Sequence, residues 1–154
     1  AAGRDVLVTA PGIDNAAELF ARAGELLATL DCLAADDSSD HDAETVGRTE
    51  RPLSTTVGGR IRFASPPDAA GLPQSPDVVL VDEAAALPVG LLEQLLAAPA
   101  VGFCTTVHGY EGAGRGFAVR FRERLADAAH DVTDVTDVTL QEPISSSLRR
   151  HPTP

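Results

Sequence analysis

The sequence contains no lysine, no methionine and no tryptophan, and a single tyrosine among its 154 residues. Its 12 basic residues are therefore all arginines, and the formal net charge is −11. Without lysine, these residues cannot supply the Gly-Lys-Ser/Thr loop with which P-loop NTPases hold phosphates. A surface this acidic binds nucleic acid poorly through bulk charge, so any contact with RNA requires a local group of arginines.

Cysteines and long apolar runs are also scarce. The two cysteines, Cys32 and Cys104, are not spaced as a zinc site, and they predict reduced thiols. No apolar run approaches the ~20 residues of a membrane helix, and the first residues show no signal-peptide pattern. We therefore expect a cytoplasmic protein with no membrane partner. The acidic composition is typical of a salt-adapted protein, although a surface shaped for a basic partner would look similar.

Apolar strand-like segments alternate with helical ones along the chain. This order predicts an α/β domain with a mostly parallel sheet and helices on both faces. The predicted strands are residues 5–11, 60–64, 77–82, 100–106 and 135–140. The predicted helices are residues 15–30, 88–98 and 116–129, the first opened by a capping box of Asn15 and Glu18. The acidic stretch 34–59 is predicted to be a flexible loop.

Two of these helices carry apolar residues at helical spacing, and we expect those residues to face the core. In the first helix they are Leu19, Phe20, Ala23, Leu26, Leu27 and Leu30, and in the last they are Phe117, Phe121 and Leu125.

Two carboxylates follow the predicted strand 77–82. Val78-Val-Leu-Val-Asp82-Glu83 has the form of a Walker B motif, in which Asp helps to hold Mg²⁺ and Glu can orient or deprotonate water. Thr105 and Thr106 end the next strand, and the carboxyl ends of parallel strands share one edge, so we expect them beside Asp82, Glu83 and Pro11. Asp-Glu or Thr-Thr at a strand end also occurs without a catalytic role, and the motif alone leaves both interpretations open.

A glycine-rich turn follows, His108-Gly109-Tyr-Glu111-Gly112-Ala-Gly114-Arg115-Gly116. Glycine lets backbone amides approach a phosphate or a base, and a helix N-terminus favours anions. The spacing of these glycines is not that of a Rossmann fingerprint. Arg120 and Arg124 are candidates for RNA binding, with a solvated helix face as the alternative. A thiol nucleophile at Cys104 with His108 as its base is a further interpretation, although such pairs normally meet through the fold and not in local sequence.

Two longer strings resemble a known family. Val79-Leu-Val-Asp-Glu-Ala-Ala-Ala-Leu-Pro88 and Thr105-Thr-Val-His-Gly-Tyr-Glu-Gly-Ala-Gly-Arg-Gly-Phe117 are similar to the RecD-type helicase module of tRNA(Met) cytidine acetyltransferases. Val8-Thr-Ala-Pro11 and Leu140-Gln-Glu-Pro-Ile144 match as well, so the resemblance covers about residues 4–144. It implies a RecA/RecD-like P-loop NTPase fold and a longer enzyme. That enzyme uses ATP, Mg²⁺ and acetyl-CoA to acetylate the wobble cytidine of elongator tRNA(Met).

The resemblance also implies roles for single residues. Asp82 would be linked to Mg²⁺ through water, and Glu83 would orient the attacking water. Coupling of the nucleotide to RNA or to a neighbouring domain would fall to Thr105, Thr106, His108, Gly109, Glu111, Gly112, Gly114 and Arg115.

The sequence departs from the family in three ways. The Walker A loop and the acetyltransferase domain have no counterpart in it, Ser145 stands where the family carries Arg, and the tail 145–154 matches nothing in the family. We therefore expect a partial helicase-like ATPase domain over 1–144, an unstructured tail over 145–154, and a fragment that is inactive alone. The alternative is a non-catalytic, degenerate NTPase-like α/β binding module.

Overall fold

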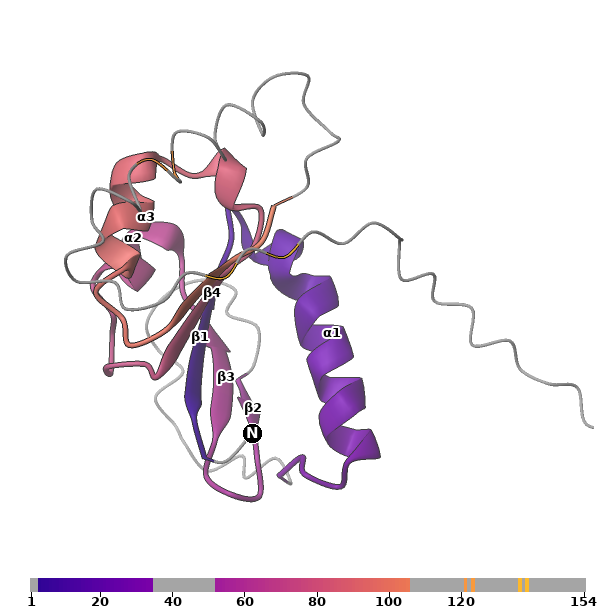
Figure 1. The fold of residues 1–154 in the computed structure, drawn as a ribbon. Coiled ribbons are helices and arrows are strands. Elements are labelled where there is room, and N and C mark those ends of the chain that lie inside the picture. Colours follow the sequence, from indigo (N-terminus) through magenta and orange to yellow (C-terminus); the bar gives the residue numbers. More distant parts are fainter. Residues whose placement is uncertain are drawn as a thin grey trace, which may run out of the picture.

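The computed structural model describes residues 3–34 and 52–105, together with residues 121, 123, 136 and 138. Within these ranges one five-stranded sheet has the order β2-β3-β1-β4-β5, with α1 on one face and α2 and α3 on the other (Figure 1). The elements along the chain are β1 (Asp5–Thr9), α1 (Ile13–Thr29), β2 (Leu53–Ser54), β3 (Arg60–Phe63), α2 (Pro66–Ala70), β4 (Val78–Val81), the 3-10 helix η1 (Ala84–Ala86), α3 (Val89–Leu95) and β5 (Val101–Phe103).

Four of the five strands run parallel, and only β2 is antiparallel to its neighbour β3. In the register, Thr9 of β1 lies opposite Val81 of β4, and Val81 lies opposite Phe103 of β5. The carboxyl ends of β1, β4 and β5 are therefore level at one edge of the sheet. The predicted α/β fold with a mostly parallel sheet is confirmed.

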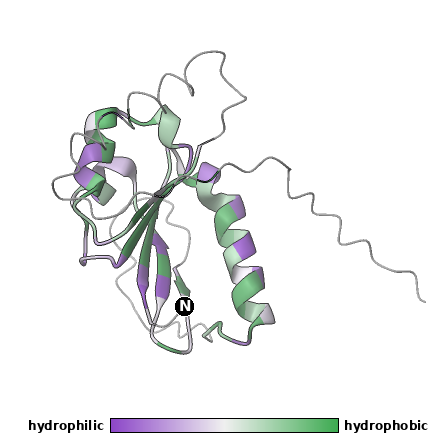
Figure 2. Ribbon diagram, in the orientation of Figure 1, coloured by the Kyte–Doolittle hydropathy of each residue, from purple (hydrophilic) through white to green (hydrophobic). Residues whose placement is uncertain are grey.

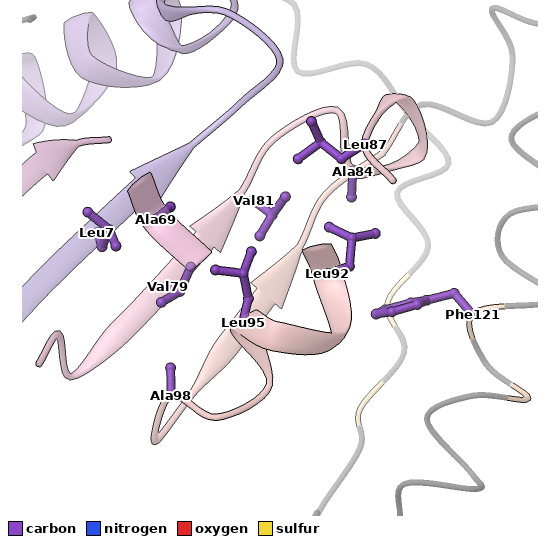
Figure 3. Packing of buried hydrophobic residues seen from close by; sticks show 10 residues of the cluster. All are labelled: Leu7, Ala69, Val79, Val81, Ala84, Leu87, Leu92, Leu95, Ala98 and Phe121. Carbon is purple, nitrogen blue, oxygen red and sulfur yellow. The ribbon is translucent and has the colours of Figure 1, made fainter. Parts of the chain in front are cut away.

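The larger of two hydrophobic clusters lies between the sheet and the α2–α3 face (Figure 3). Leu7, Val79 and Val81 contribute from the strands, and Leu92 and Leu95 contribute from α3, all fully buried. Phe121 joins this cluster at 4% exposure, and its ring meets that of Phe103 edge-on with centroids 4.7 Å apart. The prediction that Phe121 faces the core is confirmed, while Phe117 and Leu125 lie outside the described residues.

The second cluster joins α1 to the opposite face of the sheet through Ala16, Phe20, Val8 and Ala10. Hydrophobic and hydrophilic residues interleave along α1 and along β3, whereas β4 is entirely hydrophobic (Figure 2). The predicted apolar stripe was partly wrong, because Leu26 and Leu30 are 59% and 60% exposed. The buried residues of the helix are Ala16, Phe20 and Leu27, and Gly24 lies between them near Leu53. Small residues at positions 16 and 24 let the helix approach the sheet, so the buried stripe is rotated from the one that leucine spacing predicted.

The predicted start of this helix was also wrong. The helix begins at Ile13, and its N-cap is Gly12, in an extended conformation with no side-chain cap. Asn15 and Glu18 therefore do not form a capping box. Asn15 lies in the first turn, and its side chain contacts a different element of the fold.

Several other boundaries differ from the sequence-based expectation. The predicted loop 34–59 ends earlier, because Leu53–Ser54 pairs with β3 and Thr55 bridges to Leu33. The short helix α2 follows β3 where only a strand end was expected, opened by two prolines that suit a first turn. Thr136 and Val138 of the predicted strand 135–140 are not in a strand. The predicted helix 116–129 is represented by residues 121 and 123, both helical, and the predicted tail 145–154 lies outside the described residues.

No helix in the described part of the chain combines the length and apolar character needed to cross a bilayer.

A charged cluster secures the end of the sheet opposite to the carboxyl edge. The Asp5 carboxylate accepts hydrogen bonds from Arg62 (Nε to Oδ1, 3.0 Å) and Arg60 (Nη2 to Oδ2, 2.8 Å). Arg62 Nη2 also donates to the Pro73 carbonyl at 2.6 Å. Burial by itself raises the pKa of Asp5, but the hydrogen bonds from Arg62 and Arg60 outweigh it, so the pKa lies below the usual 3.8.

Asp5→Asn should lower the free energy of unfolding at neutral pH by about 1–2 kcal/mol, because a hydrogen-bonded carboxylate is lost beside two arginines. A carboxylate with a depressed folded-state pKa stabilises the fold fully above its unfolded pKa and progressively less as pH falls through the folded-state pKa. The difference between Asp5→Asn and the parent should therefore shrink below about pH 4. Denaturant unfolding from pH 7 to pH 3 measures it, with Asp31→Asn, at an exposed position, as the control. A difference that stays constant with pH would contradict the assignment.

Candidate nucleotide site at the carboxyl edge

The candidate site is built where β4 leaves the sheet between β1 and β5. The Asp82 N–H donates to the Thr9 carbonyl of β1 at 2.9 Å, and the Cys104 N–H donates to the Val81 carbonyl at 2.8 Å. The Ala84 N–H in turn donates to the Cys104 carbonyl at 2.9 Å. Backbone hydrogen bonds on both sides therefore fix the Asp82–Glu83 turn, and β4 and β5 are neighbours, as the site requires.

The two carboxylates differ in their surroundings. Asp82 is half-buried, and its Oδ1 accepts a hydrogen bond from the Glu83 N–H at 2.9 Å. Glu83 is exposed and adopts the left-handed conformation with φ 49° and ψ 42°, which is uncommon for a residue with a long side chain. Uncommon backbone conformations of this kind concentrate at functional sites, where surrounding contacts hold them in place.

A third side chain reaches this turn from another element. Asn15 Nδ2, in the first turn of α1, donates to Glu83 Oε2 at 3.0 Å, although the two residues are 68 positions apart. Sequence reasoning missed this contact, because nothing local links the first turn of a helix to a later strand end. Only the parallel pairing of β1 with β4 brings the start of α1 beside Glu83.

Two more residues at the edge were not predicted as parts of the site. Thr9 is fully buried, and its hydroxyl has no hydrogen-bond partner among the described residues. Burial, followed by the negative charge of Asp82, raises the pKa of the Cys104 thiol. A thiol whose pKa is raised remains protonated near neutral pH, which argues against Cys104 as a nucleophile.

The remaining predicted residues are only partly placed. Thr105 is the second residue after β5 and is half-buried, on the same edge as Asp82, and Pro11 follows β1 there. The other candidates for nucleotide coupling or RNA binding lie outside the described residues: Thr106, His108, Gly109, Glu111, Gly112, Gly114, Arg115, Arg120 and Arg124.

The donor set at the edge fits Mg²⁺ held through water and phosphate. Mg²⁺ keeps several waters and is commonly bound by one or two carboxylates together with substrate phosphates. Asp82 offers such a carboxylate, with Oδ1 already oriented by the Glu83 N–H. Across residues 3–34 and 52–105, no group of three His, Cys, Asp or Glu side chains forms a protein-only metal site.

Comparisons with known proteins show which family the chain resembles. A family model described as "RNA cytidine acetyltransferase NAT10/TcmA, helicase domain" matches residues 1–147. The chain is 54% identical over 144 residues to tRNA(Met) cytidine acetyltransferase TmcA of Haloferax volcanii, which covers 94% of this chain and 17% of that protein. The protein of the same name from Haloarcula marismortui is 54% identical over 139 residues, covering 90% and 17%. That of Nitrosococcus halophilus is 37% identical over 123 residues, covering 79% and 14%.

The fold has a counterpart among solved structures. A large terminase from a thermophilic bacteriophage superposes with a TM-score of 0.54 at 14% identity, covering 82% of this chain and 31% of the terminase. At that identity the likeness concerns the fold alone. The chain spans 17% of the length of the Haloferax volcanii and Haloarcula marismortui proteins. On the match over residues 1–147, the chain belongs to the family of RNA cytidine acetyltransferase NAT10/TcmA helicase domains.

Proposed function

We propose that the chain forms the Walker B part of an ATP-hydrolysing, helicase-like module in an enzyme that makes N4-acetylcytidine at the wobble position of elongator tRNA(Met). The observation that supports this proposal best is the pair Asp82–Glu83 at the carboxyl edge, fixed from β1 and β5 and held at Glu83 by Asn15. Ligands of parallel α/β sheets bind at this edge.

In this proposal the two carboxylates have separate tasks. Asp82 would hold Mg²⁺ through water, and the cation, when bound, would supply positive charge to the phosphates of ATP. Glu83 accepts a hydrogen bond from the attacking water and takes up its proton. Thr105, two residues after β5, would supply a hydroxyl that responds to the terminal phosphate. The phosphate loop and the acetyl-CoA site belong to segments outside these 154 residues, so the chain by itself hydrolyses no ATP.

The proposal also covers the RNA partner and the cellular location of the protein. tRNA is the partner, with Arg120 and Arg124 as candidates for phosphate contacts, because a chain of net charge −11 needs a local basic group to bind RNA. A cytoplasmic location is supported by the composition and by two cysteines that are free.

Asp82→Asn tests the proposal in a chimera in which residues 1–147 replace the matching segment of the Haloferax volcanii protein. We expect the Mg²⁺ concentration for half-maximal ATP hydrolysis to rise about tenfold, because a neutral amide holds the hydrated cation less well. Binding of acetyl-CoA should be unchanged. Phosphate release against Mg²⁺ and acetyl-CoA titration calorimetry measure these two effects, and mass spectrometry of digested tRNA measures the yield of N4-acetylcytidine.

Equal loss of ATP use and acetyl-CoA binding in Asp82→Asn would count against the Walker B assignment. A chimera whose yield of N4-acetylcytidine does not depend on Asp82 would favour the non-catalytic binding module instead.

A further inference from the structure

Asn15 is placed to control the carboxylate that the proposed function assigns to water activation. The hydrogen bond from its Nδ2 to Glu83 Oε2 is the one that the Glu83 carboxylate accepts from the described part of the chain. Both residues are exposed, so the bond is not a by-product of core packing. Asn15 is also uncharged, so the contact orients the carboxylate without neutralising it.

The backbone around Asn15 leaves room for this contact. Gly12 precedes the helix in an extended conformation, and a Cβ atom at Gly12 would lie 3.2 Å from Asn15 Oδ1. The Asn15 N–H donates to the Gly12 carbonyl at 3.1 Å, which closes the first turn of α1 on its N-cap residue. The amide is therefore held with its oxygen beside Gly12 and its nitrogen towards Glu83.

Glu83 is constrained at its backbone but not along its side chain. Its N–H is held by Asp82 Oδ1, and its φ of 49° sets the direction in which the side chain leaves the turn. An exposed glutamate with no partner samples several rotamers, and ordering it costs free energy. A donor on Oε2 removes that freedom and leaves Oε1 to accept a hydrogen bond from water.

We propose that Asn15 is the positioning residue for Glu83, holding the carboxylate in the orientation that activates water for attack on ATP. This inference rests on the proposed ATPase function and adds a residue from α1 to its site. Asn15 touches neither the nucleotide nor the reacting water, so its effect acts through Glu83.

The test compares variants of the same chimera, with Glu83→Gln as the reference for loss of the base. We expect Asn15→Ala to lower kcat for ATP hydrolysis about tenfold while changing the KM for ATP less than about twofold, the size expected of one hydrogen bond to a charged group. Asn15→Asp should lower kcat further, since its carboxylate repels Glu83. Asn15→Gln, which keeps the amide donor, should recover part of the loss. Gln94→Ala is the matched control, because it removes an exposed amide that donates to the Gly90 carbonyl of its own helix.

The double variant Asn15→Ala/Glu83→Gln separates positioning from general damage. If Asn15 acts through Glu83, the double variant should be no slower than Glu83→Gln alone. Additive losses, or an unchanged kcat in Asn15→Ala while Glu83→Gln is impaired, would overturn the positioning role and leave the proposed function standing. A folded chimera whose ATP hydrolysis is absent or insensitive to Glu83→Gln would overturn both.

Discussion

Glu83→Gln in the chimera should lower kcat for ATP hydrolysis by about 100-fold or more, because an amide cannot take up the proton of the attacking water. ATP affinity should change little, since the substitution preserves shape and leaves Asp82 in place. Single-turnover hydrolysis of radiolabelled ATP and equilibrium binding of a fluorescent nucleotide measure the two quantities separately. The pattern is that of a residue which acts in the transition state and contributes little to ground-state binding.

The control for this experiment is another exposed carboxylate on the same side of the sheet. Within the described residues, Glu18 on α1 pairs with exposed Arg22, at 2.8 Å, and exposed ion pairs contribute little. Glu18→Gln should therefore leave hydrolysis unchanged. A loss in Glu18→Gln equal to that in Glu83→Gln would show that general charge, and not the Glu83 carboxylate, is being measured.

Leu92→Ala should lower the free energy of unfolding of the chain by about 3 kcal/mol, a large share of the stability of a small domain. Leu92 is fully buried in the cluster of Val81, Ala84 and Leu87, so its removal leaves a cavity beneath the turn that carries Asp82 and Glu83 (Figure 3). Urea unfolding followed by circular dichroism measures the change.

Leu26→Ala is the matched control, because Leu26 is 59% exposed. The same truncation there should cost well under about 1 kcal/mol, since little apolar surface is removed from the interior. Similar losses in the two variants would contradict the packing described for α3 and α1.

Leucine spacing alone was a poor guide to the face of α1. Leu26 and Leu30 lie on the stripe that hydrophobicity predicts, yet the helix turns Ala16 and Gly24 towards the sheet. The reason is geometric: small residues allow close approach of a helix to a sheet, and close packing outweighs the burial of two leucines near the end of the helix.

The candidate site likewise combines residues that a local sequence pattern predicts with residues that only the fold brings together. Asp82 and Glu83 were recognisable because an apolar strand followed by two carboxylates is a local pattern, and Thr105 was recognisable because it ends the next strand. Asn15 was misread as part of a helix cap, since its donor and its acceptor are 68 residues apart. The burial of the Thr9 hydroxyl could not be predicted from the sequence for a similar reason. It depends on which strands lie beside β1 in the sheet.

The sequence by itself determined the four parallel strands, the family, and the position of two carboxylates at the end of a buried strand, because each depends on a pattern of adjacent residues. It did not predict β2, and it predicted a strand over 135–140 where Thr136 and Val138 are not in a strand. Tertiary structure alone decided the order β2-β3-β1-β4-β5, the face that α1 buries, and the contact of Asn15 with Glu83. These depend on which strands pair across long separations. Pairing is set by packing of the whole sheet, which no short stretch of sequence encodes.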